Sequence, residues 1–104
     1  MSQSGSNPAT VQKPKTRRKI TKPPMFRVLL HNDDYTSMDF VVDILRSIFR
    51  KSETEAVQIM LNVHYQGIGV AGLYPAQTAE TKIRSVHSRA RDNGYPLRCS
   101  MEPE

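Results

Sequence analysis

The chain has a single cysteine, no hydrophobic run long enough to cross a membrane, and no hydrophobic region near residue 1 of the kind found in secretory signals. A membrane-spanning helix needs about 18 or more consecutive apolar residues. Cys99 lies in an alternating hydrophobic segment, which predicts a buried structural thiol and not a nucleophile. We therefore expect a cytoplasmic protein that does not enter membranes.

The sequence also lacks the motifs of common enzyme classes. Its three histidines are scattered, without the paired Cys or His ligands of a zinc site. The glycines at 67 and 69 precede a predicted strand, whereas a phosphate-binding loop precedes a helix. Serine-nucleophile signatures are absent, and the adjacent Asp33 and Asp34 diverge on regular backbone. These absences indicate recognition without bond-making, and no metal or cofactor.

Acidic residues are missing from residues 1–24, which hold six Lys or Arg and four of the seven prolines. Such a segment buries too little apolar surface to offset its ordering entropy, so we predict a disordered basic extension. Residues 25–104 carry nine Lys or Arg and ten Asp or Glu, and are close to neutral. The extension makes a small nucleic-acid or ribosome-associated module the alternative function, although the remainder lacks the basic face and aromatic platform of such modules.

The first half of the near-neutral part predicts a strand and a helix. Residues 25–31 alternate in the period-two pattern of a strand. The turn formers at 32–34 end it. Apolar residues then recur at helical spacing and predict a helix over residues 39–50, capped by Thr36 or Ser37.

The second half predicts two more helices and two more strands. A capping-box pattern at residues 52–55 begins an amphipathic helix. Glycines make residues 68–74 an irregular strand, a third helix opens at Pro75 and ends at an Asn-Gly pair, and residues 97–102 alternate as a last strand. The order β-α-α-β-α-β predicts a single α+β sandwich over residues 25–104, with a three-stranded antiparallel sheet packed on three helices.

Three polar features are candidates for function: the turn at residues 32–34, His64, and the basic extension. Each also has an ordinary structural interpretation. An Asn-Asp-Asp turn usually satisfies its own backbone. A lone histidine on an apolar helix face is usually a partly buried structural imidazole, and a Lys/Arg run is usually solubilising. None of the three decides the function alone.

Four blocks of residues occur together in the order and spacing of one known family, from about Met25 onward. Several co-occurring motifs are far more specific than one short pattern. The blocks are Leu30-His31-Asn32-Asp33-Asp34-Tyr35-Thr36-Ser37-Met38-Asp39-Phe40-Val41, Val63-His64-Tyr65-Gln66-Gly67, Ala79-Glu80-Thr81-Lys82 and Asn93-Gly94-Tyr95-Pro96-Leu97. On these residues the chain resembles the ClpS family. Its members are adaptors of AAA+ Clp proteases: they capture proteins with a destabilising N-terminal residue (Leu, Phe, Tyr or Trp) and deliver them to the ATPase.

The resemblance implies a site for the α-amino group of the captured protein, made by Asn32, Asp34 and His64 with Asp33 beside them. An ammonium group has three donors and needs acceptors that converge from different directions. By this similarity Asp34 supplies the countercharge, Asn32 a carbonyl oxygen and His64 a neutral ring nitrogen. Asp33 is expected to support the turn or the local field.

The resemblance also implies an apolar slot for the side chain of the bound residue. Met38 matches a family methionine that excludes β-branched residues. One methylene in a hydrophobic pocket changes the binding free energy by only about 1–3 kcal/mol, so discrimination against Val or Ile is expected to need steric exclusion. Apart from the resemblance, the helical or strand spacing of Met60, Val63 and Leu97 favours ordinary core packing. The slot residues are Thr36, Met38, Val41, Met60, Val63 and Leu97.

Delivery, by the same resemblance, requires a surface for the N-terminal domain of a ClpA-like ATPase. Lys82 matches a family contact position, and Gln77 stands nearby where the family commonly has an acid. The extension would engage the ATPase. Three residues depart from the family pattern. Ser37 stands where the family usually has Pro, Ala71 where Cys is frequent, and Pro75 where the family has a Thr helix cap. We expect a monomer whose partners are the ATPase and substrate proteins, with no nucleic acid or membrane.

Overall fold

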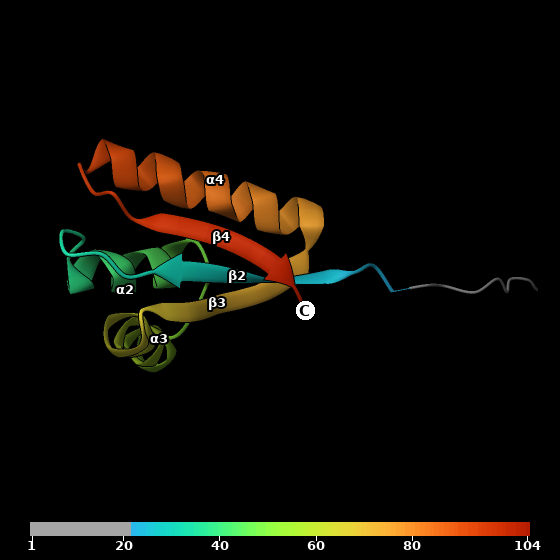
Figure 1. Cartoon of the computed structure of the whole chain (residues 1–104), viewed down its shortest axis with the longest axis horizontal. Coiled ribbons are helices and arrows are strands. Elements are labelled where there is room, and N and C mark those ends of the chain that lie inside the picture. The colour runs from blue at the N-terminus through green and yellow to red at the C-terminus, as the bar shows by residue number, and fades with distance from the viewer. Residues whose placement is uncertain (1–21) are drawn as a thin grey trace, which may run out of the picture.

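The computed structural model describes residues 22–104 of the chain. The elements follow the predicted order, and the predicted fold class, α+β with three antiparallel strands and three helices, is confirmed (Figure 1). The predicted disordered extension falls almost wholly on residues 1–21, outside the described part. The elements are β2 (Met25–His31), α2 (Met38–Ser47), α3 (Glu53–Gln66), β3 (Ile68–Pro75), α4 (Ala76–Asp92) and β4 (Arg98–Pro103).

The sheet has the order β3-β2-β4, and the central strand β2 is antiparallel to both neighbours. Val28 pairs with Gly72 and Leu29 pairs with Val70, so Ala71 is an extra residue in β3. A β-bulge of this kind bends a strand and increases its twist. It accounts for the irregular strand that the glycines predicted.

The hydrophobic core lies between one face of the sheet and the three helices. Val28 and Leu30 of β2 are fully buried there. Figure 1 shows α4 alongside β4 and α3 beside β3, and both helices contact these strands. Small residues let the helices lie close to the sheet: a Cβ atom at Gly69 would be 2.7 Å from Val63 of α3. The other buried core residues are Phe40, Val41, Ile44, Leu45, Phe49, Ala56, Val63, Ala71, Ala79, Val86, Ala90, Leu97 and Cys99.

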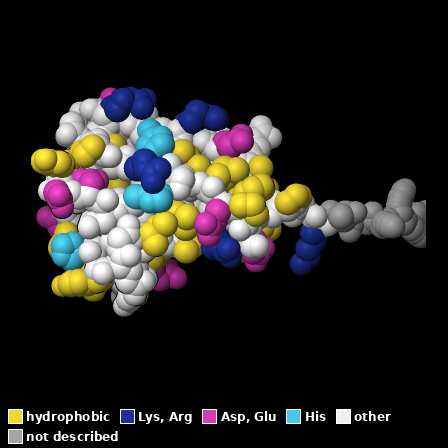
Figure 2. All heavy atoms as spheres, in the orientation of Figure 1, with side chains coloured by type: hydrophobic (Ala, Val, Ile, Leu, Met, Phe, Trp, Pro, Cys, Tyr) yellow, Lys and Arg dark blue, Asp and Glu magenta, His cyan; other side chains and the backbone are white. Residues whose placement is uncertain are grey.

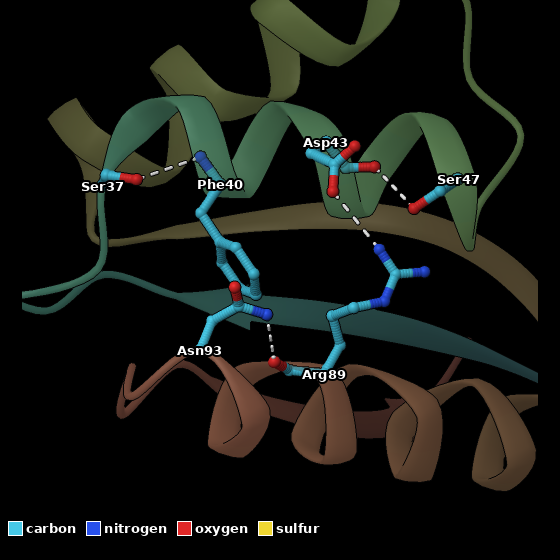
Figure 3. Close-up of polar contacts among 6 residues, drawn as sticks. All are labelled: Ser37, Phe40, Asp43, Ser47, Arg89 and Asn93. Atoms are coloured by element: carbon cyan, nitrogen blue, oxygen red, sulfur yellow. Dashed lines mark hydrogen bonds and ion pairs between the residues drawn. The ribbon is translucent and has the colours of Figure 1, made fainter.

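Helix α2 is joined to α4 by contacts that cross between the two elements (Figure 3). Arg89 of α4 donates a hydrogen bond to the Asp43 carboxylate at 3.2 Å. The Phe40 ring meets the ring of Tyr95 at a centroid distance of 4.7 Å. The middle of α2 is therefore joined to α4 through Asp43 and Arg89, and the start of α2 packs on the segment that follows α4.

The ends of α2 differ from the expectation. Ser37 is the cap, since its hydroxyl accepts a hydrogen bond from the Phe40 amide at 3.1 Å, and the helix begins at Met38. The helix stops at Ser47 instead of Arg50, because the chain turns through a left-handed residue, Arg50 (φ 58°), before α3. Phe49 continues the helical spacing but is buried from this turn, where its ring lies 6.2 Å from that of Tyr74.

Cys99 is buried in the core, only 4% exposed. Burial raises the pKa of its thiol to about 12, and its backbone amide donates to Nε2 of His87 at 3.0 Å. A thiol that stays protonated is a poor nucleophile, so Cys99 is structural.

Among residues 22–104, no helix has the length and hydrophobicity to cross a membrane, and no three His, Cys, Asp or Glu side chains gather as a metal site.

Candidate functional site

A cavity of about 390 Å³ lies between the turn that follows β2, the start of α2 and the second half of α3. It brings together every predicted site residue of the cage and the slot except Leu97. Two carboxylates line it, and no Lys or Arg does. The lining residues are Asn32, Asp33, Asp34, Tyr35, Thr36, Ser37, Met38, Val41, Met60, Val63 and His64.

Asp33 organises the turn that forms one wall. Its carboxylate accepts hydrogen bonds from the Tyr35 amide at 2.8 Å, the Thr36 amide at 2.7 Å and the Thr36 hydroxyl at 2.8 Å. Burial alone would raise the pKa of this carboxyl, but the hydrogen bonds from Thr36 and Tyr35 outweigh it and hold the pKa below its ordinary value. Asp33 is therefore ionised and committed to the turn.

Asn32 and Asp34 flank this anchored residue with free side chains. Both are exposed, and neither side chain forms a hydrogen bond or ion pair within residues 22–104. The backbone amide of Asn32 donates to the Gly67 carbonyl at 3.0 Å, which ties the turn to the end of α3. The side-chain amide of Asn32 and the carboxylate of Asp34 therefore keep unused acceptor oxygens on the exposed side of the cavity.

His64 faces the same cavity from the last turn of α3. The helix ends three residues later, where Gly67 adopts a left-handed conformation (φ 87°) and its amide donates to the Val63 carbonyl. The His64 ring contacts the ring of Tyr65 edge-on at 4.7 Å. Inside the described range, neither ring nitrogen of His64 has a hydrogen-bond partner, so one is free to accept.

The inner part of the cavity is apolar. Val41 of α2 and Val63 of α3 are 5% and 3% exposed and form its walls. Met60 is half-buried between them, whereas Met38 is 43% exposed at the first residue of α2. Ser37, where the resemblance led us to expect Pro, still starts the helix through its capping hydroxyl.

Leu97 does not line this cavity. Its side chain is 4% exposed and belongs to the hydrophobic core just before β4. The alternation of the last strand turns Leu97 toward the helices together with Cys99.

Tyr35 is a cavity residue that sequence reasoning did not single out. Its place between Asn32 and Met38 was the available signal, since a short turn between two lining residues must itself border the site.

Lys82 and Gln77 lie on α4, away from the cavity, and line a shallow surface hollow with Thr78 and Thr81. The Lys82 ammonium donates to the Ile48 carbonyl at 2.8 Å, where α2 ends. Sequence reasoning treated Lys82 as a solvated residue apart from the resemblance. A partner 34 positions away leaves no local signal in the sequence.

Replacing Lys82 by Met should lower the free energy of unfolding by about 1–2 kcal/mol, because a hydrogen bond and a cation–π contact are lost. The ammonium lies 5.1 Å from the centre of the Tyr74 ring and 5.7 Å from that of Phe49. Thermal unfolding should show a decrease in Tm of roughly 4–16 °C. Arg84→Met, on the same helix with an exposed side chain, is the matched control. Equal Tm values for the two variants would show that the Lys82 contacts do not stabilise the fold.

Comparison with known sequences identifies the family. The model described as "ATP-dependent Clp protease adaptor protein ClpS" matches residues 21–100. An ATP-dependent Clp protease adapter protein ClpS of Desulfatibacillum aliphaticivorans is 62% identical over 87 residues, which are 84% of this chain and 84% of the relative. A protein of the same name from Myxococcus xanthus is 59% identical over 88 residues, 85% of this chain and 82% of the relative. These relatives are named as adapters and not as enzymes.

A solved structure agrees with the sequence comparison. The structure of Agrobacterium tumefaciens ClpS2 bound to L-phenylalaninamide aligns with a TM-score of 0.76 and 35% identity, over 80% of this chain and 100% of that chain. The resemblance that rested on the four sequence blocks is confirmed. The chain belongs to the ClpS family of adaptors of the ATP-dependent Clp protease.

Proposed function

We propose that this adaptor captures proteins by their N-terminal residue, using the cavity between the 32–38 segment and α3, and delivers them to a ClpA-like ATPase. The observation that carries the proposal is the combination of unused acceptors on Asn32, Asp34 and His64 with an apolar slot beneath them. The cavity volume, about 390 Å³, is in the range of small-ligand sites, roughly 300–1,000 Å³.

The polar end of the cavity suits an α-ammonium group. An ammonium has three donors and no acceptor, so it pairs best with acceptors from different directions. Asp34 and Asn32 come from the turn, and His64 comes from α3 across the cavity. The ionised Asp33 adds negative charge to the same end while its oxygens stay bonded to the turn.

The apolar end suits the side chain of the bound residue. Val41, Met60 and Val63 supply its walls. We assign to Met38, which is 43% exposed and lines the cavity, the exclusion of β-branched side chains that the family resemblance implies. The ligand in the neighbouring structure, L-phenylalaninamide, carries a free α-amino group and one aromatic side chain. That pair of groups corresponds to the two ends of this cavity.

Delivery uses a different surface in this proposal. We assign it to the surface of α4 around the exposed Gln77 and the half-buried Lys82, for contact with the N-terminal domain of the ATPase. The adaptor would act as a cytoplasmic monomer, without making or breaking bonds itself. The nucleic-acid alternative would act through the basic extension, most of which lies outside the described residues; residues 22–104 themselves offer no net positive charge, with ten Lys or Arg and ten Asp or Glu.

The proposal is tested by competition. A fluorescent ten-residue peptide that begins with Leu should bind the full chain in a saturable manner, measured by fluorescence anisotropy. L-Phenylalaninamide should displace it, because both present an α-ammonium and an apolar side chain to the same cavity. Phenylpropionamide, which lacks the amino group, is the matched competitor that should fail. Absence of saturable binding, or equal displacement by the two amides, would contradict the proposal.

A further inference from the structure

The sheet has an outer face that the helices do not cover. Its residues alternate with the core residues along each strand, and in register they form three columns. On β2 the column contains Arg27, Leu29 and His31: Arg27 and His31 are half-buried, and Leu29, which pairs with Val70 and Ser100 in the middle of the face, is buried at 7% exposure. The β3 column is Ile68, Val70 and Leu73, and the β4 column is Arg98, Ser100 and Glu102.

The outer face is divided into an apolar and a polar half. Ile68, Val70 and Leu73 are 39%, 45% and 41% exposed, although all three are large hydrophobic residues. The part of the chain from Gly67 to Ala79 has no charged residue. Figure 2, which views this face, shows hydrophobic side chains gathered over β3. Single exposed hydrophobic residues are ordinary, but a contiguous group on one charge-free edge strand indicates a binding surface.

The polar half satisfies its own groups. Arg27 and Glu102 form an ion pair at 3.0 Å, and His31 and Ser100 are hydrogen-bonded at 2.7 Å. These contacts leave the β3 column as the part of the face without partners among residues 22–104. A hydrophobic strip beside a satisfied polar strip has the composition of an interface core and its rim.

The β3 column starts at the proposed amino-group site. Ile68 pairs with His31, the residue before Asn32, and the Gly67 carbonyl accepts the Asn32 amide at 3.0 Å. Ile68 also follows His64 by four positions, at the end of α3. A protein bound by its first residue continues as a chain out of the cavity, and the β3 column begins beside the 32–34 turn, in a region where Tyr35 and Tyr65 are exposed as well.

The length of the column fits a short extended segment. From Ile68 to Leu73 the strand spans roughly 15 Å at about 3.3 Å per residue. An extended chain of about six residues covers the same distance. The column could therefore be occupied by approximately the third to eighth residues of a captured protein, before its folded part begins.

We propose that the outer face of β3, formed by Ile68, Val70 and Leu73, binds apolar side chains in the extended segment behind the captured N-terminal residue. This inference rests on the proposed function of the cavity. The affinity of the adaptor for a substrate would then depend on two features, the identity of its first residue and the hydrophobicity of the segment that follows.

Peptides of different length separate the two contributions. All three peptides begin with Phe-Ser. The first has three residues and reaches only the cavity. The other two have ten residues: at alternate positions from 3 to 8 the apolar peptide carries Val and Leu, and the polar peptide carries Ser and Thr. We expect the wild-type chain to bind the apolar ten-residue peptide roughly fivefold more tightly than the polar one. Val70→Ser should remove this difference and leave the three-residue peptide unaffected. Arg91→Gln, at an exposed residue near the end of α4, is the matched control and should behave as wild type.

Several outcomes would overturn the inference. Equal wild-type affinity for the two long peptides would do so, as would an equal loss for short and long peptides in Val70→Ser. A Val70→Ser variant with unchanged peptide ratios but impaired ATPase binding or self-association would assign the face to another partner. Failure of the three-residue peptide to bind the wild-type chain would contradict the proposed function itself.

Discussion

A peptide that begins with Phe should lose nearly all affinity for this adaptor when its α-amino group is acetylated. Acetylation removes the positive charge and two of the three donors that Asn32, Asp34 and His64 would satisfy. Hydrogen bonds to charged groups contribute about 1.5–3 kcal/mol each, so the loss of two of them with the charge corresponds to at least roughly 100-fold in Kd. Fluorescence anisotropy or calorimetry with the free and acetylated peptides measures this directly.

The control for this experiment is acetylation elsewhere. A peptide with a free N-terminus and an acetylated Lys near its C-terminal end should bind as tightly as its unmodified parent, because only the first residue enters the cavity. Equal affinity of the free and N-acetylated peptides would show that the polar end of the cavity does not bind an ammonium group. The proposed roles of Asn32 and Asp34 would then be wrong.

Asp34→Asn should weaken peptide binding without destabilising the fold, whereas Asp33→Asn should do both. The Asp34 carboxylate is exposed and makes no bond within residues 22–104, so its loss removes only the countercharge of the ligand. Hydrogen bonds to charged groups contribute about 1.5–3 kcal/mol, and Kd should rise roughly 10- to 150-fold. Tm should be unchanged.

Asp33 is the matched residue, because it has the same charge one position earlier but accepts three hydrogen bonds in the turn. Asp33→Asn should lower Tm at neutral pH and weaken binding through disorder of the turn. Its folded-state pKa lies below the ordinary value of 3.8, so its ionised form stabilises the fold above that pH. The stabilisation is lost as the pH falls through the folded-state pKa, and the Tm difference from wild type should shrink there.

Identical behaviour of the two variants would contradict this assignment. If Asp34→Asn lowered Tm as much as Asp33→Asn, Asp34 would be part of the turn and not a free acceptor. If Asp33→Asn left Tm unchanged at neutral pH, the three hydrogen bonds would not stabilise the turn. Unfolding curves from pH 2 to pH 7, together with Kd at pH 7, distinguish these cases.

Local patterns in the sequence predicted the elements well. The alternation over residues 25–31 became β2, and the capping box at Ser52 and Glu55 is formed in both directions. Such signals are reliable because period and capping depend on neighbours within four residues. The prediction failed at the end of α2, where Phe49 is buried from a turn, because apolar spacing records burial and not backbone conformation.

The site was only partly accessible from the sequence. Asn32, Asp34 and His64 were named through a family resemblance, since each alone fits an ordinary turn or helix residue. The tertiary structure brings them to one cavity and shows that Asp33, of the same residue type as Asp34, is already bonded. No sequence pattern distinguishes two adjacent aspartates by their hydrogen bonds.

The sequence by itself determined the order of strands and helices, the fold class and, through its four motif blocks, the family. Tertiary structure alone decided which distant residues meet: the turn after β2 with the end of α3, Lys82 with the Ile48 carbonyl, and Leu97 with the core instead of the cavity. It also left the outer face of β3 uncovered. The physical reason is that secondary structure follows from interactions within a few residues, whereas these contacts depend on how whole helices pack against the sheet.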